Sequence, residues 1–393
     1  MRGRTIVWYA VLGGAWLTLA AGSAEAKDQP PVSVADGRKA AAAFVEAVVK
    51  GDERAFNQLV DWDALLERGM TGPTVDGSKR TGFAVGAKFS LVGPSSLARS
   101  LHKSAQGGSV RVLRVETAGP ECRALIRLLP GTGGVNYQTL HIARDKQGAP
   151  RIVDIYVFFQ GELMSDGIRR GYLSMANGSK PKDGEPAPGD ERAKHNAELT
   201  KMGENLRAGK FAEVIDAFDV LPESLQQDKS IQLMRLQAAM RFHAGIFAQA
   251  MEEFRNLFPN DPCVDMLAVD YHTVKREFPP ALDCLARLEK SVGPDPFLHV
   301  WRSRLWRAAG DLEQAHLEAE KAVQAEADLR DGYVELLELS LAQHDFAETE
   351  RMLKLLTLQF QMRFKDLSTV AAFAEFVKSP EYEHWKAAQV KAP

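Results

Sequence analysis

Five short stretches in the second half of the sequence decide its fold: Gly209-Lys210-Phe211, Gly245-Ile246-Phe247, Arg276-Glu277-Phe278, Gly310-Asp311-Leu312 and His344-Asp345-Phe346. Each stretch joins a glycine or polar turn to a bulky apolar residue. The successive apolar residues lie 36, 31, 34 and 34 positions apart. A period near 34 in a sequence of helical character indicates a stack of two-helix units.

The residues around each stretch have a clear physical role in such a unit. The turn lets two antiparallel helices reverse tightly, and the apolar residue fills the corner between them. A small residue three positions later permits the helices to approach closely: Ala250, Ala281 and Ala315, with Val214 and Thr349 in its place in the first and fifth units. Further apolar residues then pack against the next unit: Phe254, Leu285 and Leu353.

This pattern resembles tetratricopeptide repeats from about residue 195 to 363. The resemblance implies about five helical hairpins over residues 195–366, with Pro262 at the end of a second helix. We expect residues 367–393 to form capping helices and a tail, because the end of a solenoid must cover its last apolar face. That cap is predicted as a helix over 368–377, a break at Ser379-Pro380, and a short helix carrying Tyr382 and Trp385.

The first half of the chain reads as helices followed by strands. Apolar spacing predicts helices over 35–50, 52–69 and 80–105, the first capped by Asp36 and the third broken at Gly93-Pro94. Stretches rich in Val, Ile and aromatic residues predict strands over 109–117, 122–129, 135–144 and 151–159. We therefore predict an α+β domain over 32–175, with helices packed on a four-stranded antiparallel sheet, followed by an all-α helical repeat solenoid.

The order of elements from about residue 35 to 175 is similar to the nuclear-transport-factor-2-like (cystatin-like) fold. Some members of that superfamily are isomerases or hydrolases that use Asp, His and Tyr in a pocket between sheet and helices. Others only bind or dimerise. The resemblance carries no diagnostic motif, so it leaves both readings open.

A register for the last hairpin brings a polar set together. If residues 145–150 form the loop, Arg144 faces Arg151, Ile142 faces Val153, His141 faces Asp154 and Thr139 faces Tyr156. One face then carries Leu140, Ile142, Val153, Ile155, Val157 and Phe159. The other carries Tyr137, Thr139, His141, Asp154 and Tyr156, with Ile152 and Phe158.

His141, Asp154, Tyr156 and Tyr137 are the alternative catalytic set. A carboxylate that orients an imidazole supports general acid–base chemistry. The structural alternative is that His141 and Asp154 form a cross-strand pair that only stabilises the sheet. The set lies opposite the apolar face that should hold the helices, which weighs against an enclosed pocket. This position weakens the enzyme reading, which stays the alternative to a binding protein.

Six residues on the first helices of the units are predicted to line a binding groove: Arg235, Phe242, Asp270, Arg304, Arg307 and Glu338. Arg304 and Arg307 lie one helical turn apart, a spacing that suits a clamp for a carboxylate. The alternative is that these arginines are simply solvated, as most helix-surface arginines are.

The N-terminus carries an export signal. Arg2 and Arg4 precede an apolar run from Ile6 to Ala21, and Ala24-Glu25-Ala26 offers small residues for cleavage before Lys27. Residues 1–26 are predicted to be a signal peptide, because the apolar run is shorter than the roughly 20 residues of a membrane span. An uncleaved anchor is the alternative. We expect an exported protein, periplasmic or extracellular, with no membrane span after cleavage.

A stretch rich in Pro and Gly predicts a flexible linker over 176–194, between the two halves. The three cysteines do not form a scaffold. Cys263 and Cys284 are the nearest pair, but their predicted axial offset of about 9 Å is too large for a disulfide. We expect all three cysteines to be small buried side chains.

Chemistry-bearing motifs for metals, phosphates or nucleophiles are absent from the sequence, so no cofactor and no metal are predicted. The net charge of -3 argues against nucleic acid. The sequence favours an exported binding or scaffold protein that recognises a protein or peptide partner through the repeat array. Two other readings stay open: a small-molecule enzyme or ligand-binding domain tethered by the array, and an envelope scaffold that dimerises through the sheet of the N-terminal domain.

Overall fold

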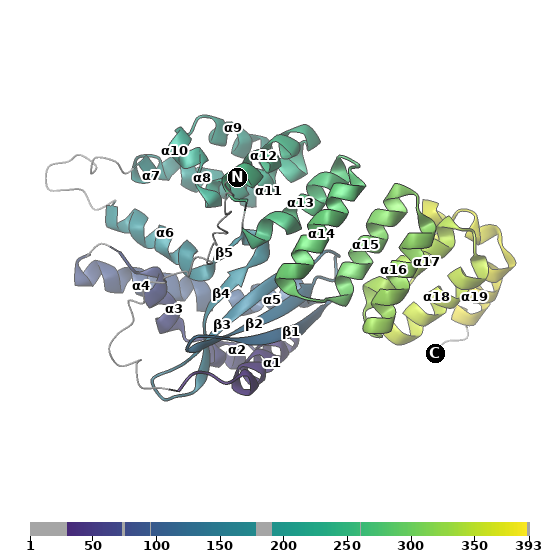
Figure 1. Cartoon of the computed structure of the whole chain (residues 1–393), viewed down its shortest axis with the longest axis horizontal. Coiled ribbons are helices and arrows are strands. Elements are labelled where there is room, and N and C mark those ends of the chain that lie inside the picture. Colours follow the sequence, from purple (N-terminus) through teal and green to yellow (C-terminus); the bar gives the residue numbers. More distant parts are fainter. Residues whose placement is uncertain (1–29, 73–74, 95, 178–190, 260, 391–393) are drawn as a thin grey trace, which may run out of the picture.

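The computed structural model describes residues 30–72, 75–94, 96–177, 191–259 and 261–390. Within these residues, a mixed part of helices and one antiparallel sheet is followed by a long stack of helices (Figure 1). The predicted signal peptide lies outside the described residues, and so do positions 178–190 of the predicted linker.

The sheet has five antiparallel strands in sequence order. They are β1 (Ser109–Ala118), β2 (Glu121–Leu129), β3 (Asn136–Arg144), β4 (Pro150–Val157) and β5 (Glu162–Leu163). The four predicted strands are present with shifts of at most two residues at each end. The predicted count of four is wrong, because a two-residue strand is too short to show any alternation in the sequence.

A bulge interrupts the pairing of β3 with β4. The predicted pairs Thr139–Tyr156 and His141–Asp154 are confirmed, and then the register shifts so that Ile142 faces Ile152. The predicted Ile142–Val153 pair is therefore wrong, and Arg144 faces Pro150 rather than Arg151. The extra residue of a bulge reverses the direction of the following side chains. Ile152 consequently joins the apolar core on the helix side of the sheet.

The N-terminal helices cover one face of the sheet, which we call the near face. The helices are α1 (Val34–Lys50), α2 (Glu53–Leu59), α3 (Trp62–Gly69), α4 (Gly77–Val92), α5 (Leu97–Ala105) and, after the sheet, α6 (Met164–Asn177). The core on the near face is apolar: Phe44 and Val48 of α1, Phe56 of α2, Leu101 of α5, and Ala124, Ile126, Leu140, Ile142 and Ile155 of the sheet.

Two details of these helices differ from the prediction. The stretch 52–69 forms two helices, because Val60 leaves the helix to bridge Ile152 and Asp61 caps α3. Ser33, not Asp36, caps α1: its hydroxyl accepts from the Asp36 amide at 3.0 Å. The predicted break at Gly93 is confirmed as the gap between α4 and α5.

Five antiparallel helix pairs form the array. The pairs are α8 (Asn196–Arg207) with α9 (Phe211–Asp219), α11 (Lys229–Phe242) with α12 (Ala244–Leu257), α13 (Pro262–Val274) with α14 (Phe278–Val292), α15 (Pro296–Ala309) with α16 (Leu312–Ala325), and α17 (Arg330–Ala342) with α18 (Phe346–Phe360). The short helices α7 (Glu191–Lys194) and α10 (Glu223–Gln226) lie between other elements. We call the first helix of each pair the A helix and the second the B helix.

The repeated apolar residues occupy equivalent corners in four units. Phe211, Phe278, Leu312 and Phe346 are each the first residue of a B helix. The residue two positions earlier is left-handed in all four: Gly209 (φ 74°), Arg276 (φ 58°), Gly310 (φ 91°) and His344 (φ 58°). The second unit differs, because His243 caps α12 and Phe247 comes three residues after its first residue.

The interior of the array follows the predicted spacing. Ala250, Ala281 and Ala315, like Val214 and Thr349 at the same place, are fully buried. The buried hydroxyl of Thr349 has a hydrogen-bond partner there, because it lies 2.9 Å from the hydroxyl of Ser340. All three cysteines are buried and free, as predicted. Pro262 begins α13 instead of ending a B helix, where its missing amide costs nothing.

The C-terminal segment covers the last unit. The predicted helix over 368–377 is wrong, since three 3₁₀ turns (Leu367–Thr369, Ala371–Phe373 and Phe376–Lys378) precede α19 (Pro380–Val390). Phe376 and Trp385 are buried in the core of the last unit, and Tyr382 stacks on Trp385 with ring centroids 5.9 Å apart. These aromatic side chains therefore serve packing.

Candidate functional site

The second face of the sheet, which we call the far face, packs against the edge of the array where the A helices begin (Figure 1). Leu125, Tyr137 and Phe158 share one core with the array. The A helices begin with acidic caps, Asp261 on α13 and Asp295 on α15. The carboxylates of this acidic edge bind cations and hydroxyl groups of the sheet. The edge is therefore covered by the sheet of the same chain.

Arg127 of β2 is the centre of that contact. Its guanidinium is fully buried and forms ion pairs with Asp295 and, at 2.6 Å, with Glu326. Burial works to lower the pKa of Arg127, but the two carboxylates outweigh it and raise the pKa. Nearby, Arg111 of β1 lies 3.1 Å from Glu326 and also pairs with Asp328. A buried ion network of this kind depends on every partner being present.

Tyr137 and Tyr156, two residues of the alternative catalytic set, belong to the same contact. The Tyr137 hydroxyl donates to Asp295 at 2.6 Å, and the Tyr156 hydroxyl donates to Asp261 at 3.0 Å. Burial raises the pKa of both phenols, and the neighbouring carboxylates raise it further. Both tyrosines therefore stay protonated and act as hydrogen-bond donors between sheet and array.

Asp154, the third residue of that set, caps a helix. One carboxylate oxygen accepts from the Ser165 hydroxyl at 2.5 Å, and the other accepts from the amides of Ser165 and Ile155 at 3.2 and 2.9 Å. Ser165 lies in the first turn of α6. Burial raises the pKa of Asp154, against the effect of these hydrogen bonds. Its satisfied carboxyl holds α6 against β4.

His141, the fourth residue, sits beside Asp154 in the register but pairs elsewhere. Its Nδ1 lies 3.5 Å from Glu121, which also binds Arg68 of α3. Burial opposes ionisation of Glu121, yet His141 and Arg68 together lower its pKa to about 2. Each of the four residues therefore has a structural partner: Tyr137 and Tyr156 bind the array, Asp154 caps α6 and His141 lies beside Glu121.

Arg304 and Arg307 of the predicted groove bind the next A helix instead of standing free. Arg304 lies 3.1 Å from Asp331, and Arg307 lies 2.6 Å from Glu335 and also pairs with Glu338. Glu335 is almost fully buried between the two arginines. The predicted carboxylate clamp is thus filled by carboxylates of α17, which link the fourth and fifth units.

Of the remaining groove residues, Arg235 is buried, whereas Phe242 and Asp270 reach the surface. Arg235 is buried, lies over the Phe218 ring at 4.3 Å and pairs with Glu253. Phe242 is about half exposed. Asp270 reaches solvent but has protein on most sides, and this burial raises the pKa of its carboxyl to about 6. Phe242, Asp270 and Glu338 are therefore the groove residues that a partner can reach.

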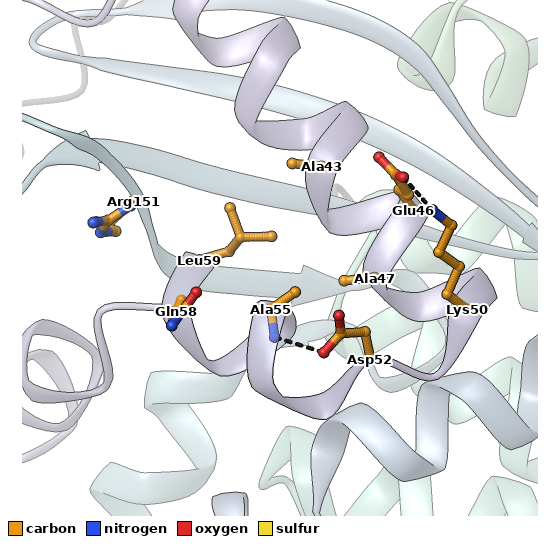
Figure 2. A pocket seen from close by; sticks show the side chains of 9 residues that line it. All are labelled: Ala43, Glu46, Ala47, Lys50, Asp52, Ala55, Gln58, Leu59 and Arg151. Atoms are coloured by element: carbon orange, nitrogen blue, oxygen red, sulfur yellow. Dashed lines mark hydrogen bonds and ion pairs between the residues drawn. The ribbon is translucent and has the colours of Figure 1, made fainter.

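A hollow lies away from all of these residues, between α1, α2 and β4. Its volume is about 610 Å³, and Figure 2 shows its wall of small apolar side chains with a charged rim. Lys50 pairs with Glu46 on that rim at 2.6 Å, and Arg151 pairs with Asp145 at 3.1 Å. The hollow is open to solvent, and its fourth charged side chain, Asp52, caps α2 by accepting from the Ala55 amide at 2.9 Å.

The described residues contain no cluster of His, Cys, Asp or Glu that fits a metal ion. Among the helices that the structure describes, none combines the length and the apolar character needed to cross a bilayer.

Comparisons with known proteins give this geometry no name. No protein-family description, no curated protein and no solved structure matches the chain. Its function must therefore be argued from its own residues.

Sequence reasoning missed the contact between sheet and array. Arg127, Asp295 and Glu326 lie far apart in the chain, and nothing in their local sequence marks them as partners. One signal was present: Arg127 lies in β2, where six of the other eight positions are buried. A charged residue inside such a strand needs a partner of opposite charge.

Proposed function

We propose that this chain is an exported binding or scaffold protein, and that its array recognises a protein or peptide partner in the manner of tetratricopeptide repeats. The observation that supports this most directly is the repeated corner of the units, with the same residue class beginning four of five B helices. Stacked repeats of this kind present an extended surface that no single helix pair has.

The α+β part, which we compare with the nuclear-transport-factor-2-like fold, then acts as a support that fixes the array. This reading is favoured over a tethered enzyme because His141, Asp154, Tyr137 and Tyr156 each have a structural partner. Helices and array together cover both faces of the sheet in one chain. A homodimer stays a prediction, and it would have to use a surface other than an open sheet face.

Site-specific photo-crosslinking in the producing cell tests the proposal. A photoreactive amino acid is placed singly at Phe242, Asp270 and Glu338, and at Leu358 as the control. Leu358 is 83% exposed and lies on the B helix α18. We expect one discrete crosslinked product from the A-helix positions and none from the control. Products that are absent, or identical from all four positions, contradict the proposal.

The export part of the proposal has a separate test. Cell fractionation followed by N-terminal sequencing should find a mature chain that begins at Lys27. A chain that keeps Met1 and stays in the cytoplasm contradicts export without touching the binding role.

A further inference from the structure

One edge of the array is basic. Its A–B turns in the first three units carry six basic residues, which we call the basic edge: Arg207, Lys210, Arg241, His243, Lys275 and Arg276. All six side chains are exposed, and none forms an ion pair with a described residue. His243 caps α12 through its Nδ1, so the other five, all Arg or Lys, supply the positive charge. The carboxylates of Glu204 and Glu213 lie close to these turns in the sequence, Glu252 and Glu277 act on Lys275, and Glu277 is already bound by His272 at 2.8 Å. The five cations therefore outnumber these carboxylates.

The basic edge is continuous across the three units. The Arg241 guanidinium lies 5.8 Å from the ring of Phe211 in the preceding unit. The ring of Phe247 lies 6.4 Å from that of Tyr271 in the following unit, and Lys275 donates to the Tyr271 hydroxyl at 2.6 Å. Aromatic faces thus hold several of the cations in fixed places, which lowers the entropy lost when a partner binds.

Apolar side chains lie among these cations. Met240 and Phe242 at the end of α11 are 38% and 49% exposed, and Val274 at the end of α13 is 52% exposed. The B helix α12 begins at the same edge with no acidic residue in its first turn, and its N-terminal end adds partial positive charge. The surface therefore combines shallow apolar contacts with positive potential.

Arg276 places a charged side chain at a turn position that favours glycine. It adopts the left-handed conformation at the position where two other units have Gly209 and Gly310 and the fifth unit has His344. A side chain in that conformation costs free energy that glycine avoids. Strain of this kind is retained where the side chain has a use. Here the side chain extends over Phe278 at 5.9 Å and remains exposed without a carboxylate partner.

We infer that the basic edge binds an acidic peptide segment that carries apolar or aromatic side chains. The opposite edge of the same array supports this by charge complementarity, because its carboxylates bind cations of the sheet: Asp295 binds Arg127, and Asp328 binds Arg111. The A helices are about 20 Å long at 1.5 Å per residue, so the two edges are separate surfaces. A lipid surface fits less well, since the apolar side chains are half buried and do not project for insertion.

This inference rests on the proposed binding function, and a direct binding assay tests it. The chain from residue 27 is titrated into a fluorescein-labelled peptide of repeated Glu-Glu-Leu-Glu-Glu-Phe, and fluorescence anisotropy is measured at low and high salt. The same peptide with Lys in place of Glu and vesicles of phosphatidylglycerol are the other two probes. We expect salt-sensitive binding of the acidic peptide alone. Binding of the vesicles in preference to that peptide, or no binding of the peptide, overturns the inference.

One double variant and a control locate the site. The double variant Arg241→Glu/Arg276→Glu should weaken peptide binding by about tenfold or more, because each change replaces an attraction by a repulsion. Arg54→Glu changes an exposed arginine of α2 and should leave the affinity within about twofold, as expected for a charge outside the contact. Equal affinities for the double variant and the control overturn the inference.

Arg276→Gly separates strain from binding. Glycine relieves the left-handed turn, so the thermal midpoint should rise while peptide affinity falls. A higher midpoint with unchanged affinity contradicts the role of Arg276.

The crosslinking experiment distinguishes failure of the acidic-peptide inference from failure of the proposed binding function. If the double variant leaves the crosslinked product from position 242 unchanged, the acidic partner is wrong and the binding function stands. If no array position yields a product, the binding function itself fails.

Discussion

The two faces of the sheet are held in different ways. The near face meets α1, α2 and α5 through an apolar core, with one ion pair at its edge between Arg144 of β3 and Asp36 of α1. The far face meets the array through Arg127, Tyr137 and their carboxylate partners. Apolar contacts tolerate the loss of one member by partial collapse of the cavity. A buried ion network does not, because the remaining charges stay buried without compensation. The two faces should therefore respond differently to the same kind of truncation.

The largest effect is expected from Arg127→Ala on the far face. It leaves Asp295 and Glu326 facing a buried space without a cation, which should cost about 3–5 kcal/mol of the free energy of unfolding. Urea denaturation of the chain from residue 27 measures this cost. Arg54→Ala, at an exposed arginine, is the matched control and should change little. A loss below about 1 kcal/mol for Arg127→Ala, the usual size for a surface pair, means that the far face is not held by ions.

Ile142→Ala on the near face should cost about 2–4 kcal/mol, the usual range for a truncated aliphatic core residue. Ile142 is fully buried among apolar side chains. Its cost should be the same at low and at high salt and across neutral pH, because no charge takes part. A strong dependence on either condition, measured by the same denaturation series, would show that the two faces are not distinct in kind.

Glu121→Gln tests how the free energy of unfolding depends on pH at an ion pair that is partly open to solvent. The folded-state pKa of Glu121 is about 2, below its usual 4.5, so its ionised form stabilises the fold above pH 4.5. That stabilisation is lost as the pH falls from 4.5 towards 2. We expect the variant to cost about 2 kcal/mol at pH 7, an estimate that allows for partial solvent screening. The cost should shrink steadily in denaturation curves at lower pH, and a constant cost from pH 7 to pH 3 contradicts the ion pairing.

The smallest effect is expected from His344→Gly, which should raise the free energy of unfolding by about 0.5–1 kcal/mol. His344 is left-handed in the last A–B turn, far from the sheet in the chain. If the far face joins sheet and array into one cooperative unit, calorimetry should show a single transition that shifts upward. Two transitions, of which only one moves, would show that the ionic contact does not couple the two parts.

The near face and the array were largely predictable from the sequence. Period 2 marks strands and period 3.6 marks helices, so β1–β4 and the corner residues from Phe211 to Phe346 follow from local patterns. The bulge between His141 and Ile142 was missed, although the adjacent apolar residues Ile152 and Val153 interrupt the alternation of β4 at that place. The contact of Arg127 with Asp295 joins positions 168 residues apart, and a local pattern carries no information at that range.

The candidate site was predicted less well, and the reason is chemical. Arg304 and Arg307 were placed correctly on A helices, but the carboxylates of α17 that neutralise them sit one unit further along the chain. The basic edge escaped notice because its cations are spread over three turns. Only stacking of the units brings Arg241 next to Phe211 and makes a single surface.

The buried arginine of β2 also sets an order of events during synthesis. Arg127 leaves the ribosome long before Asp295 and Glu326 are translated. All strands of the sheet are therefore synthesised while its far face is still exposed to solvent. A fragment that stops in the segment between α6 and α7 would keep that side permanently uncovered. Such a fragment should aggregate or demand a chaperone, and the shortest stretch of this chain able to fold unaided extends at least to α17.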